Sequence, residues 1–241
     1  MISKATLKSI KALKLKKYRT KEQKFLVEGI KSVNELIHEK WDIEVIIATK
    51  KSIDFLSDIS KIEVVSKELL ESLTQLSTNE DCLAVARMPK KEKTAVDIRH
   101  HIIALDGIQD PGNLGTIIRT LDWFGFNQIV CSKDTVDFYN PKTINASMGS
   151  FTRVYPHYLE LPLFLSQSQL PVFGLDMAGT DSRFLNFDRP AIFVLGNESN
   201  GIRSELRGQI DNYLSIAGKG NVESLNIGIT AGILIYQLAE I

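Results

Sequence analysis

The chain has 241 residues, of which 44% are hydrophobic, and its 29 basic side chains are balanced by 29 acidic ones. This length holds one large domain or two modest ones with real cores, and the charge balance excludes a uniformly basic or acidic protein. No apolar run approaches the roughly 20 residues that span a bilayer. The first residues lack the apolar stretch of a signal peptide, so we expect a cytoplasmic protein without a membrane segment.

Positive charge is concentrated at the start of the chain. Residues 1–31 carry nine lysines and one arginine against two glutamates, a net charge of +8. Leu7, Ile10 and Leu13 repeat every three residues, which predicts an amphipathic helix with lysines on its other sides. Clustered lysines favour binding to nucleic acid, because phosphate contacts release counterions. A solvated helix face carries the same pattern, so the segment alone leaves both interpretations open.

Residues 1–88 are predicted to form a small α/β domain. The expected elements are a helix over 29–39, strands over 43–48 and 62–65, a helix over 66–76 and a strand in DCLAVARM. The next stretch, residues 89–97, is charged and begins with Pro89, which is typical of a linker. We therefore expect a second domain over residues 98–241.

The second domain contains four apolar runs that read as buried strands. They are HIIALDGI at 101–108, QIVCS at 128–132, PVFGLDM at 171–177 and AIFVLG at 191–196. Continuous apolar strands separated by helices indicate a parallel sheet that is covered on both faces. Such sheets bind ligands at the carboxyl ends of their strands, so the loops after these runs are the candidate sites.

The sequence contains no pattern typical of a metal site or of the common catalytic and nucleotide-binding motifs. Cys82 and Cys131 lie inside apolar runs and are expected to be buried free thiols. The four histidines lack the spacing of metal ligands, so we expect no metal. The chain has no Walker A loop, no GxGxxG fingerprint and no GxSxG elbow.

The first candidate loop follows the run at 101–108, in the stretch DGIQDPGNLGTIIRTLDWFG. Apolar residues three and four apart predict a helix that begins near Asn113, and Asn113 is well placed to cap its first turn. At about 100° per residue, Arg119 lies opposite the apolar stripe and must face solvent, a partner or a ligand. An ordinary turn with a surface arginine accounts for the pattern equally well.

The second candidate loop is FVLGNESNGI, at 193–202. A strand that ends in Gly196 lets a ligand approach the backbone, and Glu198 would lie at the rim of the crevice. The alternative is a plain Gly-Asn turn with a capping glutamate, and for Asn197 a turn role alone is sufficient.

The third candidate loop lies in SIAGKGNVESLNIGITAGILIYQL. A short strand, NYLSI, gives way to a glycine-containing loop and then to a helix that is predicted to start near Ser224. Ser224 and Asn226 both crowd this start. Capping of the helix explains one of them but not both.

In order, DPGNLGTIIRT, FVLGNESNGI and ESLNIGITAGILIY resemble the three signature motifs of the SpoU (TrmH-like) family of RNA ribose 2′-O-methyltransferases, of the SPOUT superfamily. NPKTINASMGS at 140–150 also fits, so the resemblance covers the chain from about residue 100 onward. The stretch KYRTKEQKFLVEGIKSVNEL is similar to the L30e-like substrate-binding domain of family members that act on ribosomal RNA.

The resemblance implies an α/β fold, with a C-terminal parallel-sheet domain that ends in a deep trefoil knot and a small N-terminal α/β domain of the L30e type. It implies S-adenosylmethionine as cofactor, RNA as substrate with rRNA favoured over tRNA, and a homodimer. Carried over by motif, the residues at the reacting end would be Asn113, Arg119, Glu198, Ser224 and Asn226. The residues against the cofactor would be Leu195, Gly196, Ile216 and Leu225.

The family proposal makes the arginine of the first motif, here Arg119, the group that activates the ribose hydroxyl. A guanidinium has a pKa above about 12 and stays protonated, which favours a clamp on a neighbouring phosphate and electrostatic stabilisation of the alkoxide over the role of base. Glu198 is expected to orient Asn113 or Arg119, and Asn226 to fix its loop.

The chain departs from the family pattern at two places. IAGKG replaces the more usual Ile-Pro-Met before the third motif, so Ala217 and Gly218 leave that loop less rigid and are expected to weaken cofactor binding. Asn145 stands where an arginine is common, which predicts a missing RNA contact. The alternative functions are a tRNA 2′-O-methyltransferase and a non-catalytic RNA-binding ribosome-assembly factor. Loss of Arg119, Glu198 or Asn226 would favour the second, and all three are present.

Overall fold

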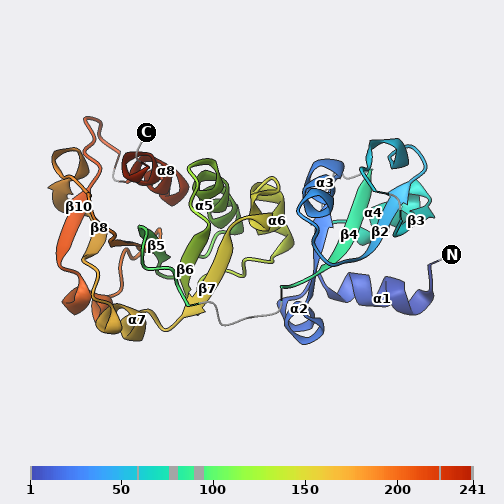
Figure 1. Cartoon of the computed structure of the whole chain (residues 1–241), viewed down its shortest axis with the longest axis horizontal. Coiled ribbons are helices and arrows are strands. Elements are labelled where there is room, and N and C mark those ends of the chain that lie inside the picture. Colours follow the sequence, from blue (N-terminus) through green and yellow to red (C-terminus); the bar gives the residue numbers. More distant parts are fainter. Residues whose placement is uncertain (1, 59, 76–80, 90–94, 223, 240–241) are drawn as a thin grey trace. The chain divides into compact units, whose positions relative to one another are not determined.

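The computed structural model describes residues 2–58, 60–75, 81–89, 95–222 and 224–239 (Figure 1). The chain divides into two compact units. Unit 1 comprises residues 1–93 together with residues 137–152, and unit 2 comprises residues 94–136 and 153–241. The linker predicted at 89–97 lies mostly outside the described residues.

Unit 1 contains a mixed sheet of four strands in the order β1-β4-β2-β3. The strands are β1 (Lys24–Glu28), β2 (Ile43–Thr49), β3 (Ile62–Val65) and β4 (Cys82–Arg87). β2 and β3 are parallel, whereas β4 pairs antiparallel with both of its neighbours. The strands predicted from the apolar runs are confirmed. β1 was not predicted, because its three apolar residues lie between charged ends within the basic segment.

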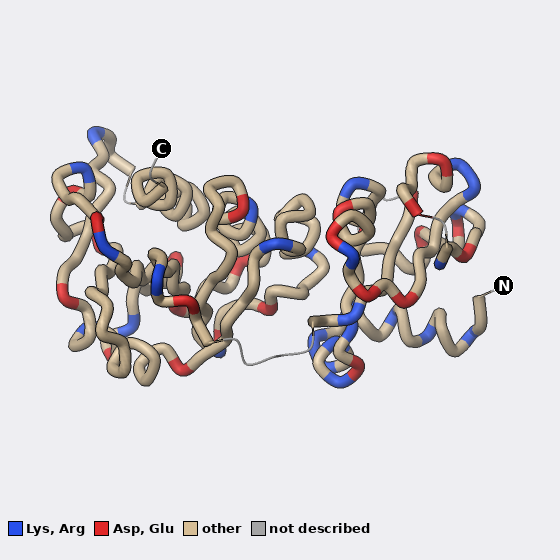
Figure 2. The backbone as a smooth tube through the Cα atoms, in the orientation of Figure 1, with Lys and Arg blue, Asp and Glu red and all other residues tan. Residues whose placement is uncertain are grey.

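The basic segment forms two of the helices of unit 1 and supplies residues to its core. The helices of this unit are α1 (Lys4–Ala12), α2 (Lys16–Glu22), α3 (Ile30–His38), the 3-10 turn η1 (Ile53–Phe55) and α4 (Lys67–Leu73). Ile10 and Leu13 are fully buried and pack in one apolar cluster with Leu70 and Leu73. The lysines of α1 and α2 lie at intervals along these helices (Figure 2). The predicted amphipathic helix is confirmed.

Residues 137–152, which the predicted domain boundaries assign to the C-terminal domain, pack in unit 1. They form α6 (Pro141–Ala146) and the 3-10 turn η2 (Ser150–Thr152). The Phe25 ring lies 4.7 Å from the Tyr139 ring and 5.9 Å from the Phe151 ring. Arg19, only 2% exposed, donates to Asp137 at 2.6 Å. Nothing in this stretch of sequence indicates which core its aromatic residues join.

We expect Phe151→Ala to lower the free energy of unfolding by about 3–5 kcal/mol, because it leaves a cavity beside the rings of Phe25 and Trp41. Urea denaturation followed by tryptophan fluorescence measures this loss. Phe55→Ala is the matched control, since Phe55 is 63% exposed in the same unit and its truncation should change stability by less than about 0.5 kcal/mol. Equal losses from both variants would contradict this description of the unit 1 core.

Unit 2 is built on a six-stranded sheet in the order β10-β8-β9-β5-β6-β7, in which every pair is parallel. The strands are β5 (Ile102–Leu105), β6 (Gln128–Ser132), β7 (Tyr155–Leu159), β8 (Val172–Asp181), β9 (Ile192–Leu195) and β10 (Asn212–Ser215). The predicted parallel sheet is confirmed. β7 was not predicted, because it is a half-buried edge strand that contains Pro156.

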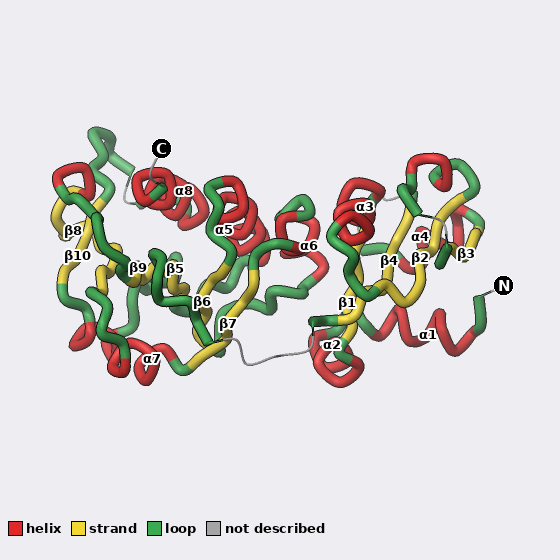
Figure 3. Tube along the Cα trace, viewed as in Figure 1, coloured by secondary structure: helices red, strands yellow, loops and turns green. Residues whose placement is uncertain are grey.

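Helices cover both faces of this sheet (Figures 1 and 3). They are α5 (Pro111–Trp123), α7 (Leu161–Gln167) and α8 (Ile227–Leu238), with the 3-10 turns η3 (Ser182–Phe184) and η4 (Ser204–Gln209). Ile102 and Ala104 of β5 pack in one cluster with residues of α7 and η4. α5 and α8 lie together on the other side of the sheet. The first turn of α5 follows the carboxyl end of β5, and a hydrogen bond from Asn226 to Asn113 places the start of α8 beside it.

Candidate functional site

The three candidate loops meet at the carboxyl edge of the unit 2 sheet. The Asn113 side chain donates from Nδ2 to Oε1 of Glu198 at 2.9 Å. The Asn226 side chain donates from Nδ2 to Oδ1 of Asn113, also at 2.9 Å. A single chain of hydrogen bonds therefore runs from the third loop through the first to the carboxylate of the second.

The cap of α5 differs from the prediction. α5 begins at Pro111, and its cap is Asp110, whose carboxylate accepts from the backbone N–H of Asn113 at 2.8 Å. Asn113 is therefore not the capping residue. Because Asp110 satisfies the first turn, the amide of Asn113 is available to join the other two loops.

The start of α8 also differs from the prediction, by three residues. α8 begins at Ile227 and is capped by Asn226, whose Oδ1 accepts from the backbone N–H of Gly228 at 2.9 Å. The two ends of one amide thus do two jobs, since Oδ1 caps the helix while Nδ2 donates to Asn113. Ser224 and Leu225 precede the helix and are exposed.

Asn197 is a link between loops in addition to being a turn residue. Its Nδ2 donates to the backbone carbonyl of Gly107 at 2.8 Å, while its Oδ1 accepts from the N–H of Ser199 at 2.9 Å. A backbone bridge from Asn197 to Gly201 closes the turn. Sequence reasoning missed this role, because a Gly-Asn turn carries no sign of a distant carbonyl.

The backbone of this turn alone requires glycine at Gly196. A Cβ atom there would lie 2.2 Å from the carbonyl carbon of Gly201 and 2.3 Å from the nitrogen of Ile202. The close approach of the chain to itself therefore accounts for the residue. That Gly196 admits a cofactor stays a prediction, as does the cofactor role of Leu195, whose side chain is fully buried at the end of β9.

Arg119 lies on the exposed side of α5, as predicted. Within the described part of the chain it makes no side-chain hydrogen bond and no ion pair. It follows Asn113 by six residues, which on an α-helix is about 9 Å along the axis and about 120° around it. The structure therefore does not bring Arg119 into the hydrogen-bonded group of Asn113, Glu198 and Asn226.

The loop between β10 and α8 is open. Ile216 is half-buried, and residues 217–222 are exposed. At Gly218 and Gly220, an added Cβ would meet nothing within 4 Å. The backbone of this loop is therefore accessible at both glycines. Ser224, near the end of the loop, makes no side-chain hydrogen bond to the described residues.

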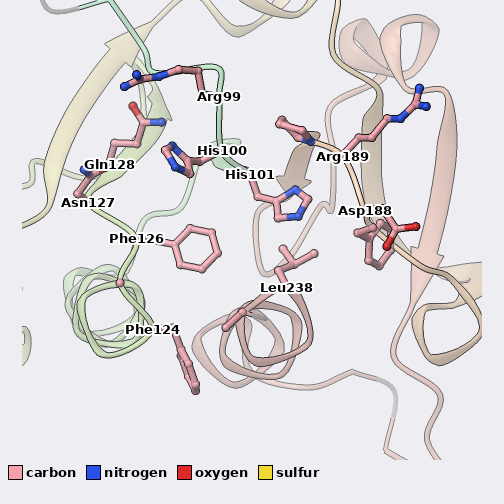
Figure 4. Close-up of a pocket in the computed structure, with 14 residues that line it drawn as sticks. Arg99, His100, His101, Phe124, Phe126, Asn127, Gln128, Asp188, Arg189 and Leu238 are labelled. Carbon is pink, nitrogen blue, oxygen red and sulfur yellow. The ribbon is translucent and has the colours of Figure 1, made fainter. Parts of the chain in front are cut away.

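A cavity of about 390 Å³ lies at the opposite, amino edge of the unit 2 sheet. Figure 4 shows Phe126 and His101 directed toward its centre, whereas Arg99 and Arg189 point away from it. Arg99 is held by Asp97 at 2.7 Å. None of the nine predicted site residues lines this cavity, so the carboxyl edge remains the candidate site.

Cys82 and Cys131 are both buried and neither forms a disulfide, as predicted. Burial raises the pKa of Cys82 to about 12 and raises that of Cys131 as well. Within the described ranges, no three side chains of His, Cys, Asp or Glu gather as a metal site would require. The same residues include no helix with the length and apolar character needed to cross a membrane.

Comparison with known proteins matches two family models. The model of the SpoU rRNA Methylase family matches residues 100–236, and that of the MRM3-like substrate binding domain matches residues 4–84. The chain is 30% identical to the 23S rRNA (guanosine(2553)-2′-O)-methyltransferase RlmP of Bacillus subtilis, over 96% of this chain and 95% of that protein.

Two solved structures match over nearly their whole lengths. A TrmH-family protein from Porphyromonas gingivalis is 32% identical, with a TM-score of 0.85 over 99% of this chain and 98% of that one. The SpoU methyltransferase AviRb from Streptomyces viridochromogenes, in complex with the cofactor AdoMet, has a TM-score of 0.85 over 98% of this chain and 97% of that one. At 21% identity, this second likeness shows the fold alone.

Proposed function

This chain belongs to the SpoU rRNA methylase family, and we propose that it transfers a methyl group from S-adenosylmethionine to a ribose 2′-hydroxyl of ribosomal RNA. The observation that carries the proposal is the chain of hydrogen bonds from Asn226 through Asn113 to Glu198. It joins the three motif loops at the edge where parallel sheets bind ligands. The Bacillus subtilis relative is named for the same reaction on 23S rRNA.

The proposed reaction asks two things of the protein. Methyl transfer is an in-line displacement, so the site must align the methyl donor with the attacking hydroxyl and assist the loss of one weakly acidic proton. Asn113 is fixed at both ends of its amide, by Glu198 and by Asn226, so it is suited to orient a ligand. Arg119 would supply positive charge beside the developing alkoxide.

The residues present fit S-adenosylmethionine. The exposed backbone at Gly218 and Gly220 has open space beside it, so it is accessible to the hydrogen-bonding edge of an adenine. Half-buried Ile216 and exposed Leu225 would supply apolar contact on either side of that loop. When bound, the cofactor supplies an electrophilic methyl group.

Incubation of the purified protein with methyl-labelled S-adenosylmethionine and unmodified ribosomal RNA tests the proposal. We expect label at ribose 2′-oxygens, located by mapping of nuclease-resistant positions. A parallel incubation with unmodified tRNA distinguishes the RNA class. Absence of label in both RNAs, together with no cofactor binding by calorimetry, would overturn the proposed function.

We also propose that the basic side of α1 and α2 contacts RNA phosphates. Lys4, Lys8 and Lys11 recur three and four residues apart on α1, and all three are exposed. Exposed Lys16 and Lys17 continue the charge onto α2 (Figure 2). Deletion of this arm would not test the proposal cleanly, because the arm also supplies buried core residues to unit 1.

Replacement of these five lysines by glutamine is therefore the better test. We expect weaker RNA binding and a salt dependence that is less steep by about one unit of slope for each phosphate that is no longer neutralised. Filter binding across a series of salt concentrations measures the slope, and calorimetry should find the affinity for S-adenosylmethionine unchanged. An unaltered salt dependence would show that these lysines form a solvated helix face and do not contact RNA.

A homodimer is proposed from the exposed apolar side chains of α5 and α8. Trp123 is 83% exposed, Ile229 52% and Tyr236 59%. Exposed apolar side chains on two neighbouring helices favour burial in an interface. The resemblance to the SpoU family supports a second copy of this chain as the partner. Light scattering of the purified protein tests this, and a monomer would contradict it.

The deep trefoil knot is likewise a proposal. It rests on the family resemblance and on the path of the chain, which leaves β10 at one edge of the sheet and returns to place α8 beside α5. A crystal structure in which the C-terminal segment leads away without passing through another loop would contradict it.

A further inference from the structure

Asp106 is a fully buried carboxylate at the carboxyl edge of the sheet, directly after β5. Its Oδ1 accepts from Nε of Arg203 at 2.6 Å, and its Oδ2 accepts from the backbone N–H of Arg203 at 2.9 Å. A buried charge of this kind is tolerated only where it is paired and hydrogen-bonded. The pair was not predicted, because neither residue stands out within its motif.

The pair connects the first two motif loops. Asp106 opens the loop that leads to Asn113, and Arg203 follows the turn that carries Glu198. Asn197 makes a second tie between the same loops, to the carbonyl of Gly107. Glu198 therefore lies between two fixed points, Asn197 on one side and Arg203 on the other.

The positive charge of Arg203 is neutralised by carboxylates of the protein itself. Besides Asp106, its guanidinium lies 3.5 Å from carboxylate oxygens of Asp134 and of Glu205. The hydrogen bond to Asp106 is the main reason that the pKa of Arg203 is raised. Three carboxylates around one guanidinium disfavour any contact with an RNA phosphate, which would need free positive charge.

From this geometry we infer that Asp106 and Arg203 are positioning residues for methyl transfer. They hold the turn 196–203 so that Glu198 meets Asn113 and the backbone after β9 keeps the shape that receives the cofactor. The inference rests on the proposed function of the carboxyl-edge site. It distinguishes Arg203 from Arg119, since Arg203 acts through the loop and touches neither RNA nor the reacting atoms.

The test compares Arg203→Met and Asp106→Asn with the unmodified chain. We expect each to weaken S-adenosylmethionine binding, measured by calorimetry without RNA, by roughly tenfold. Misplacement of Glu198 and Asn113 should lower kcat by about a hundredfold. RNA affinity by filter binding should stay within about twofold, because neither residue neutralises a phosphate. Arg203→Lys, which keeps one charged donor, should regain part of the cofactor affinity.

Arg207→Met is the matched control. It removes an exposed arginine of the neighbouring turn η4, whose side chain makes no hydrogen bond or ion pair with the described residues. We expect its cofactor affinity and kcat to equal those of the unmodified chain. Arg203→Met leaves the buried charge of Asp106 without its ion-pair partner and can prevent folding, so the double variant Asp106→Asn with Arg203→Met, which removes both charges of the pair, is measured alongside it.

The double variant separates positioning from general stability. If the two residues act through each other, its losses in cofactor affinity and kcat equal those of one single variant instead of their product. Multiplied losses, or folded variants with wild-type affinity and kcat, would overturn the inference. If the unmodified chain itself neither binds S-adenosylmethionine nor methylates RNA, it is the proposed function that fails.

Discussion

Replacement of Arg119 by alanine is expected to lower the rate of methyl transfer by a factor of about 100 to 1,000, the usual cost of removing one group that stabilises a developing oxyanion. Cofactor affinity should be unchanged, because the Arg119 side chain makes no hydrogen bond or ion pair within the described chain and lies about 9 Å along α5 from Asn113. Single-turnover methylation with saturating RNA measures the rate, and calorimetry measures the binding of S-adenosylmethionine.

Two further variants decide what Arg119 does. Arg119→Lys keeps the positive charge, and Arg119→Gln keeps a hydrogen-bond donor without the charge. If the guanidinium acts electrostatically, lysine restores part of the rate and glutamine does not. Arg189→Ala is the control, since Arg189 is an exposed arginine at the amino edge of the same sheet. Unchanged methylation by Arg119→Ala would remove Arg119 from the reaction.

Periodicity and the apolar runs were sufficient to predict the frame of unit 2. Four continuous apolar runs predicted the central strands and the parallel sheet, and hence the edge at which Asn113, Glu198 and Asn226 meet. The edge strand β7 escaped prediction because Pro156 and half-burial weaken its pattern. Buried strands can therefore be predicted from their continuous apolar runs, whereas a half-buried edge strand has too weak a hydrophobic pattern to be predicted.

The details of the site depend on contacts that no local pattern encodes. Both helix starts were placed wrongly, because several polar residues in each loop can cap a helix and only the fold decides which one does. Asp106 and Arg203 are 97 residues apart in the chain, and their pairing requires the strand order β9-β5. Packing of residues 137–152 into unit 1 is a tertiary choice of the same kind.

Mixing two inactive variants is expected to restore activity if Arg119 serves the site of a second subunit. On α5 Arg119 is about 9 Å and about 120° away from Asn113, so it faces away from the motif loops of its own chain. Arg119→Ala and Glu198→Ala alone should each show no more than about a hundredth of the wild-type rate. In a mixed dimer, one of the two sites combines an intact Arg119 from one chain with an intact Glu198 from the other.

The amount of activity restored follows from symmetry. Random exchange makes about half of the dimers mixed, and each mixed dimer holds one complete site of two, so the mixture should reach about a quarter of the wild-type rate. Co-expression of the two variants, each with a different affinity tag, allows the mixed dimer to be purified. Its rate should then approach about half of the wild-type rate. If Arg119 and Glu198 instead serve a site within one chain, a dimer of either variant with the wild-type chain should keep about half of the wild-type rate. A dimer of the two variants should then have no activity, because each chain lacks one of the two residues. Absence of activity in the paired variants would therefore place Arg119 and Glu198 in the site of one chain.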